Sequence, residues 1–420
     1  MKKIIAVILS LTMLASVFAI PANAAETDAE EYPYIFVHGM GGWAPDNPVY
    51  DLSPYWGGGL SLGSDTDLIE ILNEKGIEAY APAVGPLSSA WDRACELYAQ
   101  LTGTVVDYGE AHSTEHNHDR YGFDYTGKAT MGEPWDLKEK INLVGHSFGG
   151  ATVRLLTSLL VYGDADEIAA TGDETSPLFT GGHDCVHSCI TLSAPHNGSQ
   201  VANMLVDPQL IFLMSAAINV IGTVFGNNFL VFSFQLGHFG ITPEEDEFRA
   251  FINPAGVWNF YATNDNCGYD MTLRGAAELN EKIKLAPNTY YYSYVTANTK
   301  EGSIIKCQLP DKGLSPIFYI SSMMLASTKG FTVDGIKIEG DWEVNDGIVP
   351  LASAKYPSNN ADTALSYEAE IEKGNAIESG RWYYFEPMTG MDHFDFCGTQ
   401  DYPMGFEEFY LGIINTANSR

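Results

Sequence analysis

The sequence has little positive charge. It contains 22 lysine and arginine residues against 54 aspartate and glutamate residues, which gives a formal net charge of -32. A protein with this charge repels the phosphate backbone of nucleic acids and anionic lipid headgroups, because both bind through basic side chains. We therefore expect no nucleic-acid partner.

Cysteine is also sparse, with six residues in a chain of 420. Six thiols are compatible with disulfides in an exported protein, but a chain of this length can bury a core of its own and does not need them to define its fold. If Cys185 and Cys189 lie on one strand, four steps of about 3.3 Å separate them too far to pair with each other. The other cysteines are Cys95, Cys267, Cys307 and Cys397.

Internal repeats and low-complexity linkers are absent as well, which favours one large domain with insertions over two small ones. Residues 1–24 begin with Lys2 and Lys3, continue with an apolar stretch that is short for a membrane span, and end in Ala22-Asn23-Ala24. This pattern is typical of a secretory signal peptide that is cleaved after Ala24. We expect a secreted, extracellular monomer without an integral membrane span, in which residues 25–420 form the mature domain.

Strand and helix patterns alternate along the chain. The alternation indicates an α/β fold with a mostly parallel sheet that helices cover on both faces. In such a sheet the functional groups gather on loops at the carboxyl ends of the strands. Strands are predicted within residues 32–43, 77–84, 141–144, 187–195 and 289–297, and helices within 66–75 and 151–161.

The stretch GHSFGG, residues 145–150, lies between a predicted strand and a predicted helix. A serine in a Gly-x-Ser-x-Gly turn of this kind is raised above the sheet as a nucleophile, and small neighbours permit the strained corner. A tight corner built only for packing is the alternative. The strand-turn-helix context favours Ser147 as a nucleophile.

A serine nucleophile needs a base, and the base needs a third group that orients it. In the chain order Ser, acid, His, the downstream candidates are Asp346 in NDGIVP and His393 in GMDHFDF. Asp346 has an alternative reading as a simple Asx-turn residue, and Asp392 or Asp395 are alternative acids. Asp346 is preferred, because an acid adjacent to the histidine in sequence usually points elsewhere.

Two backbone N–H donors are required for a developing oxyanion. The first strand ends at His38-Gly39, which leaves the N–H of Met40 able to face the serine, and Phe148 supplies the second donor directly after the nucleophile. A plain glycine turn is the alternative explanation of the glycines near Met40.

From about Tyr34 to its end, the sequence resembles the secreted true lipases of thermophilic bacilli, with the staphylococcal lipases as near relatives. The resemblance is carried by VHGMGGW, AVGPLSSAWDRACELYAQLTGTVVDYGEAH, HDRYGFDY, GHSFGGATVRLL, TSPLFTGGH, APHNGS, APNTYYYS and NDGIVP. It implies an α/β-hydrolase fold, carboxylester hydrolysis through an acyl-enzyme, the triad Ser147, Asp346 and His393, and the oxyanion donors Met40 and Phe148.

The resemblance also implies a structural zinc ion in an inserted subdomain around residues 85–125. Two imidazoles and two carboxylates are a reasonable tetrahedral set, closed to water. The spacing of His112 and His118 does not suit one face of a helix, so we expect the metal ligands to lie on a loop. A solvated histidine-rich loop without a metal is the alternative. Cys267 lies close in sequence and could compete for the metal. The implied ligands are Asp92, His112, His118 and Asp265.

A calcium site near the histidine is the second metal that the resemblance implies. It maps to Gly313, Asp395 and Asp401, but the spacing of Asp401 and Pro403 differs from the acid-proline pair of the family, and Asp395 stands where a glutamate is expected. The residues are compatible with a calcium ion and with its absence.

Residues 208–232 are the most apolar stretch of the mature chain. Glycines and the Asn227-Asn228 pair interrupt this stretch, which disfavours a buried core helix and a short membrane span and favours a helical lid around residues 205–245. The resulting prediction is a secreted triacylglycerol lipase that acts on lipid or another ester at an interface. A short-chain carboxylesterase, an aliphatic polyester hydrolase, a zinc hydrolase and an inactive adhesion module are the alternatives.

Overall fold

The computed structural model describes residues 31–45, 50, 53–59, 64, 66–205, 263–304, 306–399 and 405–420. The predicted signal peptide, residues 1–24, lies outside the described residues. The same holds for nearly all of the predicted lid, residues 206–245, and for Asp401 of the calcium site. These three expectations stay predictions.

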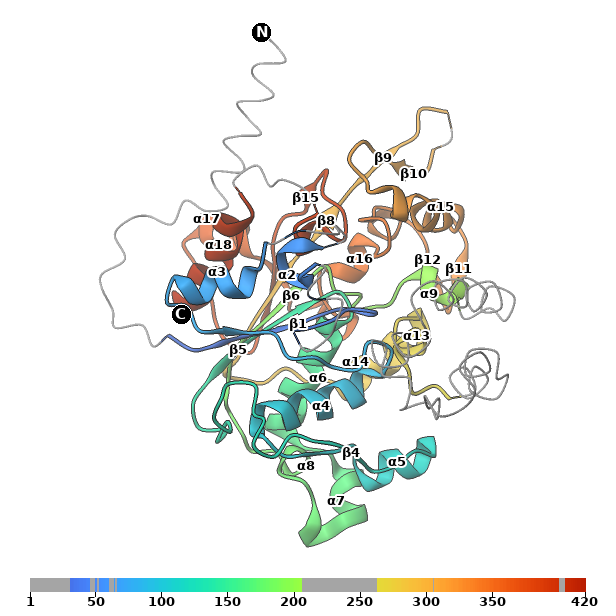
Figure 1. The fold of residues 1–420 in the computed structure, drawn as a ribbon. Coiled ribbons are helices and arrows are strands. Elements are labelled where there is room, and N and C mark those ends of the chain that lie inside the picture. The colour runs from blue at the N-terminus through green and yellow to red at the C-terminus, as the bar shows by residue number, and fades with distance from the viewer. Residues whose placement is uncertain are drawn as a thin grey trace.

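A seven-stranded sheet forms the centre of the molecule (Figure 1), and every pair of neighbouring strands in it is parallel. The predicted α/β architecture with a mostly parallel sheet is therefore confirmed. In spatial order the strands are β13 (Leu365–Ser366), β14 (Trp382–Tyr384), β7 (Tyr290–Tyr294), β6 (Val186–Leu192), β5 (Ile141–His146), β1 (Tyr34–Val37) and β2 (Ala79–Tyr80).

Alternate side chains along the strands pack into two separate hydrophobic cores. On β1, Ile35 and Val37 pack into one core, whereas Tyr34 and Phe36 pack into the other, because successive side chains of a strand point to opposite faces. Helices α4 (Ala90–Thr102) and α6 (Gly149–Tyr162) cover the first face. Helices α3 (Leu68–Glu74) and α18 (Phe406–Asn418) cover the second (Figure 1).

Local sequence signals set the helix ends. The Asp67 side chain accepts hydrogen bonds from the N–H groups of Ile69 and Glu70, which caps α3. After α3 the chain reverses at Gly76, whose φ of 80° suits glycine, and it then enters β2. The predicted order of helix, glycine stop and strand is confirmed here.

Residues between β2 and β5 form α4, β3 (Val105–Asp107), α5 (Glu110–His116) and β4 (Tyr121–Asp124). Strands β3 and β4 make a small antiparallel sheet, and α5 packs against α7 (Ala165–Thr171) at the lower end of the view in Figure 1. The buried Glu167 carboxylate accepts hydrogen bonds from the N–H groups of Ala111 and His112, at 3.0 and 2.7 Å. This contact fixes the start of α5 against α7.

Smaller elements complete the described fold, and all six cysteines are buried free thiols. No helix in the described ranges is long and apolar enough to cross a membrane. The further helices are α2 (Tyr55–Gly58), α8 (Pro177–Thr180), α9 (Gln200–Leu205), α13 (Cys267–Asp270), α14 (Leu273–Lys282), α15 (Tyr319–Ser327), α16 (Leu351–Ala354) and α17 (Tyr367–Lys373). The further strands are β8 (Thr296–Ala297), β9 (Thr299–Glu301), β10 (Gln308–Pro310), β11 (Thr332–Val333), β12 (Ile336–Lys337) and β15 (Met388–Thr389).

Candidate active site and metal cluster

Ser147 lies at the corner between β5 and α6, as the motif predicts. Its φ of 53° is left-handed, which is uncommon for a residue with a side chain. A Cβ on Gly149 would lie 2.3 Å from the Val37 carbonyl oxygen, and a Cβ on Gly150 would lie 2.3 Å from the Ala194 Cβ. The glycine pair therefore lets α6 start directly against the sheet and holds the serine in its strained position.

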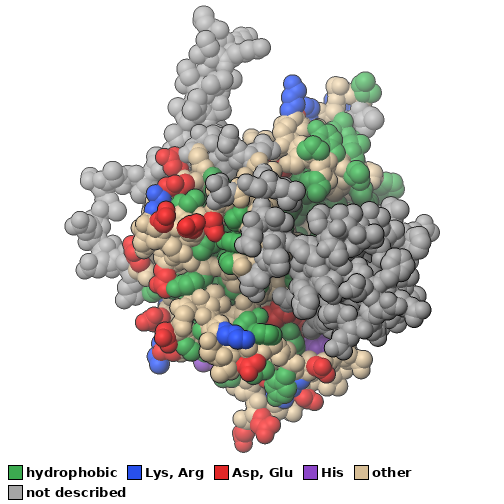
Figure 2. Space-filling view, viewed as in Figure 1, with side chains coloured by type: hydrophobic (Ala, Val, Ile, Leu, Met, Phe, Trp, Pro, Cys, Tyr) green, Lys and Arg blue, Asp and Glu red, His purple; other side chains and the backbone are tan. Residues whose placement is uncertain are grey.

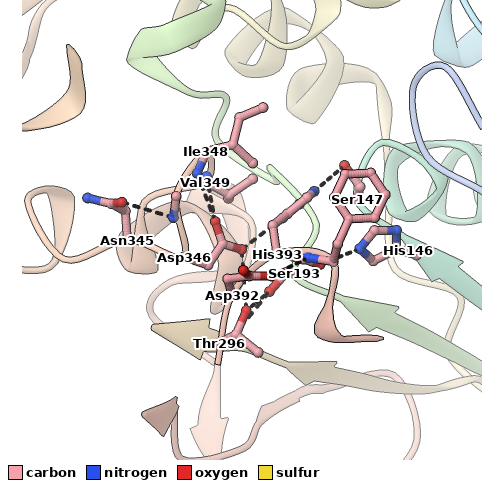
Figure 3. A network of polar contacts seen from close by, with 12 residues as sticks. His146, Ser147, Ser193, Thr296, Asn345, Asp346, Ile348, Val349, Asp392 and His393 are labelled. Carbon is pink, nitrogen blue, oxygen red and sulfur yellow. Dashed lines mark hydrogen bonds and ion pairs between the residues drawn. The ribbon is translucent and has the colours of Figure 1, made fainter. Parts of the chain in front are cut away.

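His393 lies between Ser147 and Asp346 (Figure 3). Its Nε2 is 2.8 Å from the Ser147 Oγ, and its Nδ1 is 2.8 Å from the Asp346 Oδ2. All three side chains are buried. The structure thus brings together three residues that span most of the described chain, in the hydrogen-bond order of a nucleophile, a base and an orienting acid.

Asp346 is held by the turn in which it stands. Its Oδ1 accepts the N–H groups of Ile348 at 3.1 Å and Val349 at 2.8 Å, while its backbone carbonyl accepts the His393 N–H at 3.0 Å (Figure 3). The residue is therefore an Asx-turn residue and the acid next to His393 at the same time, because each role uses a different carboxylate oxygen.

The two alternative acids make other contacts. Asp392 accepts the N–H groups of Ser315 at 2.8 Å and Phe394 at 3.0 Å. Asp395 accepts the Asp392 N–H at 2.6 Å. Both carboxylates thus shape the loop that carries His393, and the acid bonded to the imidazole is Asp346.

Met40 and Phe148 flank the serine from two neighbouring strands, since Met40 follows β1 and Phe148 follows the end of β5. Gly39 packs so closely that a Cβ added to it would lie 2.7 Å from the Ser147 Cβ and 3.2 Å from its Oγ. Within the described ranges, neither the Met40 N–H nor the Phe148 N–H donates to another group of the protein. Two unused donors therefore stand beside the serine.

A second cluster of polar side chains lies between α4 and α5. The His112 Nε2 is 3.2 Å from the Asp92 Oδ1 and 3.4 Å from the Asp265 Oδ2, and the His118 Nε2 is 3.3 Å from the same Asp265 oxygen. One ligand atom from each of these four residues lies within 4.8 Å of all the others. We refer to Asp92, His112, His118 and Asp265 as the Asp/His cluster; it has the composition of a metal site.

Comparison with known proteins assigns the family. A family model described as "Lipase-like, C-terminal domain" matches residues 30–416. The chain belongs to this lipase-like family.

Relatives with solved structures share the fold. EstA from Clostridium botulinum is 32% identical with a TM-score of 0.80, over 95% of this chain and 90% of that one. The Staphylococcus hyicus lipase is 28% identical with a TM-score of 0.74, over 94% of this chain and all of that one. Lipase 2 of Staphylococcus aureus is 34% identical over 395 residues, which are 92% of this chain and 54% of the relative. The chain spans about half the length of the curated relatives it matches.

The Asp/His cluster of this lipase-like protein differs from the expected loop site. His112 lies within α5, and only His118 lies beyond its end, so the expectation of a loop site was wrong for His112. The chain turns back at Asn117, whose φ is 57°, and the His118 N–H bonds the Ser113 carbonyl at 3.1 Å. This left-handed turn aims both imidazoles at the same carboxylates, which helical spacing alone would not do.

Burial excludes a solvated histidine-rich loop. Asp92 and Asp265 are buried, and the Trp91 indole stacks on the His112 ring with centroids 5.0 Å apart. Cys267 begins the short helix α13 and does not belong to the cluster. Burial raises the pKa of its thiol to about 12, which disfavours the thiolate that would compete for a metal.

The buried carboxylates of the Asp/His cluster favour a positive charge, either a proton or a cation, beside them. Burial would lower the pKa of His112, but hydrogen bonds to Asp265 and Asp92 raise it to about 9. Burial would raise the pKa of Asp265, but its contacts with His112 and His118 hold it well below its usual range. Burial, with Asp265 and Asp92 nearby, raises the pKa of Asp270 to about 7. Two close buried carboxylates thus need protons or a cation between them.

The candidate calcium residues are only partly described. The segment that follows Gly313 lies beside the His393 loop, because the Ser315 N–H donates to Asp392. Burial, and then the neighbouring Asp392, raise the pKa of Asp395 to about 7. Calcium binding by Gly313, Asp395 and Asp401 stays a prediction.

Sequence reasoning missed Tyr55 and His146. The Tyr55 hydroxyl accepts the Gly39 N–H at 2.9 Å and lies 2.6 Å from the His146 Nδ1, and the His146 Nε2–H donates to the His393 carbonyl at 2.9 Å. Burial, followed by the proximity of His393, holds the pKa of His146 well below its usual value, so the ring is neutral. These buried hydrogen bonds connect the Gly39 backbone, through Tyr55 and His146, to the backbone of His393. No motif or spacing in the sequence predicts them.

Proposed function

We propose that the protein is a secreted serine carboxylester hydrolase, preferentially a triacylglycerol lipase, that works through an acyl-enzyme on Ser147. The observation that carries the proposal is the His393 imidazole, which bonds the Ser147 hydroxyl at Nε2 and the Asp346 carboxylate at Nδ1. The named lipases among the relatives support ester hydrolysis.

In the proposed reaction, the Ser147 Oγ attacks the ester carbonyl while the His393 Nε2 accepts its proton. Asp346 accepts the Nδ1–H throughout, which holds the tautomer and stabilises the imidazolium. The tetrahedral intermediate collapses as His393 returns the proton to the departing alkoxide, which leaves as the alcohol. Water then attacks the acyl-enzyme by the same steps and releases the acid.

The negative charge of the tetrahedral intermediate needs preorganised donors. We assign this role to the N–H groups of Met40 and Phe148, whose lack of partners among the described residues supports it. Phe148 is buried, and an unpaired buried donor is costly, so its N–H beside the nucleophile favours a function over a structural accident.

An exposed apolar surface supports a substrate that is insoluble in water. Figure 2 shows hydrophobic side chains gathered where Figure 1 places α15, β9 and β10. Residues 312–331 contain no acidic side chain although the whole chain has a net charge of -32. Phe318, which lies between the exposed Ile317 and Tyr319, packs edge-on against the His393 ring with 6.1 Å between centroids. We define the α15 patch as Ile317, Tyr319, Ile320, Met323 and Phe331, all at least 45% exposed.

We assign the Asp/His cluster to one structural zinc ion. A tetrahedral site with zinc–ligand distances of about 2.0 Å separates its ligand atoms by about 3.3 Å, and three of the four His–Asp distances here are 3.2 to 3.4 Å. Four protein ligands leave no position open for catalytic water. The ion would therefore hold α4 and α5 to the segment that carries Asp265 and stabilise this contact. The chemistry of ester cleavage stays with Ser147 and His393.

Covalent labelling tests the proposed function. An organophosphonate ester should inactivate the enzyme in step with attachment of one phosphonyl group to Ser147, located by peptide mass spectrometry, and Ser147→Ala should remain unlabelled. A protein that keeps its esterase activity when fully exposed to the reagent, yet loses activity at once on chelation, would instead be a zinc hydrolase. Absence of both label and turnover would favour a catalytically silent module.

The proposed location is extracellular. Residues 1–24 have the pattern of a cleaved signal peptide. Intact-mass analysis of protein recovered from the culture medium should give a chain that begins at Ala25, and retention of Met1 in the medium form would contradict cleavage.

A further inference from the structure

Arg93 is a fully buried cation behind the serine site. It follows Asp92 on the first turn of α4, and its side chain has no solvent exposure. Its Nη2 donates to the His38 carbonyl at 2.5 Å, its Nη1 to the carbonyls of Gly85 at 3.0 Å and Gly39 at 3.4 Å, and its Nε to the Thr152 hydroxyl at 2.9 Å. Every one of these acceptors is a neutral oxygen.

The Arg93 guanidinium makes no ion pair with a described carboxylate, although Glu96 lies one turn further along α4, and such burial is costly for the folded protein. Transfer of a charge out of water is unfavourable, and here neutral dipoles replace the usual ion pair. An arginine side chain stays protonated at neutral pH, so the buried guanidinium carries its charge. A buried charge that is held in one place favours a function, namely an interaction with a negative charge that forms nearby.

The contacts of Arg93 lead to both proposed oxyanion donors. The Gly39 carbonyl that it bonds belongs to the same peptide unit as the Met40 N–H. Its guanidinium carbon also lies 5.2 Å from the centre of the Phe148 ring. Thr152, which accepts the Nε–H, donates in turn toward the Phe148 carbonyl at 3.4 Å. Arg93 therefore bonds the Gly39–Met40 peptide directly and contacts Phe148 through its ring and, by way of Thr152, its carbonyl.

We propose that Arg93 is a positioning residue of the oxyanion hole, which orients the Gly39–Met40 peptide and places a positive charge behind the developing oxyanion. This inference rests on the proposed function. A donor bonded to a carbonyl oxygen polarises the peptide and strengthens its N–H as a donor. The charge is fixed before the reaction begins, so it stabilises the transition state without reorganisation.

The chemistry predicts where the effect appears in the kinetics. An ester substrate is neutral when it binds, and the negative charge arises only in the tetrahedral state. Arg93 should accordingly act on kcat and leave KM nearly unchanged. It should also favour any ligand that becomes a tetrahedral anion on Ser147, such as an alkylboronic acid.

The experiment compares Arg93→Met with the matched control Arg154→Met. Arg154 is also a buried arginine, but it bonds the Asn280 Oδ1 at 2.8 Å and lies near His196, away from the Gly39 loop. Active sites are counted by the organophosphonate burst, so partial misfolding does not enter kcat. We expect Arg93→Met to lose about 10- to 100-fold in kcat per active site, with KM changed by less than about twofold and the boronate affinity reduced in parallel. Arg154→Met should lose thermal stability and retain kcat per active site.

Two milder variants keep the test decisive if Arg93→Met fails to fold. Thr152→Val removes the acceptor of the Arg93 Nε–H, and Arg93→Lys keeps the charge but loses the planar fork. We expect each to lower kcat per active site by about three- to tenfold at constant KM. Unchanged kcat and boronate affinity per active site in the folded variants would overturn the inference and leave Arg93 a structural residue. A wild-type enzyme without any phosphonate burst would instead refute the serine mechanism itself.

Discussion

The serine site and the Asp/His cluster bury similar side chains in opposite ways. At the serine site the Asp346 carboxylate accepts hydrogen bonds from one imidazole and two backbone N–H groups. Protein groups alone therefore balance its charge. In the cluster two carboxylates share two imidazoles. The charge of the Asp346–His393 pair is thus balanced by protein groups, whereas the two carboxylates of the cluster need an added proton or cation.

The two sites also differ in how the chain assembles them. Ser147 and His393 are 246 residues apart, and they meet because the parallel sheet brings the carboxyl ends of its strands to one edge. In the cluster, three of the four residues come from the 92–118 segment and only Asp265 comes from elsewhere. The serine site thus depends on the whole fold, and the cluster mainly on one segment of the chain.

The strongest test of this contrast removes single members of the serine site. Ser147→Ala and His393→Ala should each lower ester turnover by about four orders of magnitude or more, because the residues act as a unit. The thermal midpoint should hardly move, since the site needs no partner from outside the protein. Asp346→Asn should approach the same loss, whereas Asp392→Asn should not, and the reverse order would assign the acid to Asp392.

Removal of the metal should affect stability and spare turnover. At a thousandfold excess over its dissociation constant, an ion that binds only the folded state adds about 4 kcal/mol. His118→Ala or chelation should therefore lower the thermal midpoint and remove about one equivalent of zinc by elemental analysis. The matched control is His116→Ala, whose ring lies 4.5 Å from that of His112 but outside the cluster. A control that also loses the metal would contradict the assigned ligands.

His38, in the loop next to the serine site, should make the stability of the fold fall in acid. Burial, and then Arg93, lower the pKa of His38 to about 3, and an unfolded histidine titrates near 6.5. The stability that a neutral His38 contributes is complete above pH 6.5 and is lost as the pH falls toward 3, by up to about 1.4 kcal/mol per pH unit. His38→Gln should reduce the slope of unfolding free energy against pH in this window by about one proton. An unchanged slope would mean that His38 takes up its proton in the folded state as readily as in the unfolded state.

The smallest effect is expected at the surface beside the serine site. Ile320→Ser and Met323→Ser reduce the apolar area of the α15 patch without touching Ser147. We expect about three- to tenfold lower activity on a long-chain ester emulsion and unchanged activity on a short, dissolved ester. Ile371→Ser, an exposed position on α17, is the control and should alter neither. Equal losses on both substrates would argue against the patch as the contact with an interface.

The sequence predicted those features that depend on order along the chain. The glycines around Ser147, the buried strand before it and the helix after it leave one plausible local geometry. The downstream order of Asp346 and His393 then selects them from many acids and histidines. The family resemblance added the members of the Asp/His cluster, which spacing alone does not link.

What the sequence did not predict depends on packing between distant segments. Tyr55, His146 and Arg93 meet the loop before Met40 only after the sheet has formed, and their spacing has no period or motif. The loop geometry expected for His112 failed because one left-handed residue, Asn117, ends α5 just before His118. Single backbone angles of this kind are not encoded in hydrophobic pattern.

The first turn of α4 joins the two sites. Asp92 on this turn enters the Asp/His cluster, and its neighbour Arg93 holds the carbonyls of the Gly39 loop. The turn is secured at its start by Ser89, which accepts the Asp92 N–H, and by Asp270, which accepts the Ala90 N–H at 2.7 Å. If these few residues fray while the sheet stays intact, both buried sites open together. We therefore expect heating to abolish the proposed esterase activity below the temperature at which the domain melts cooperatively.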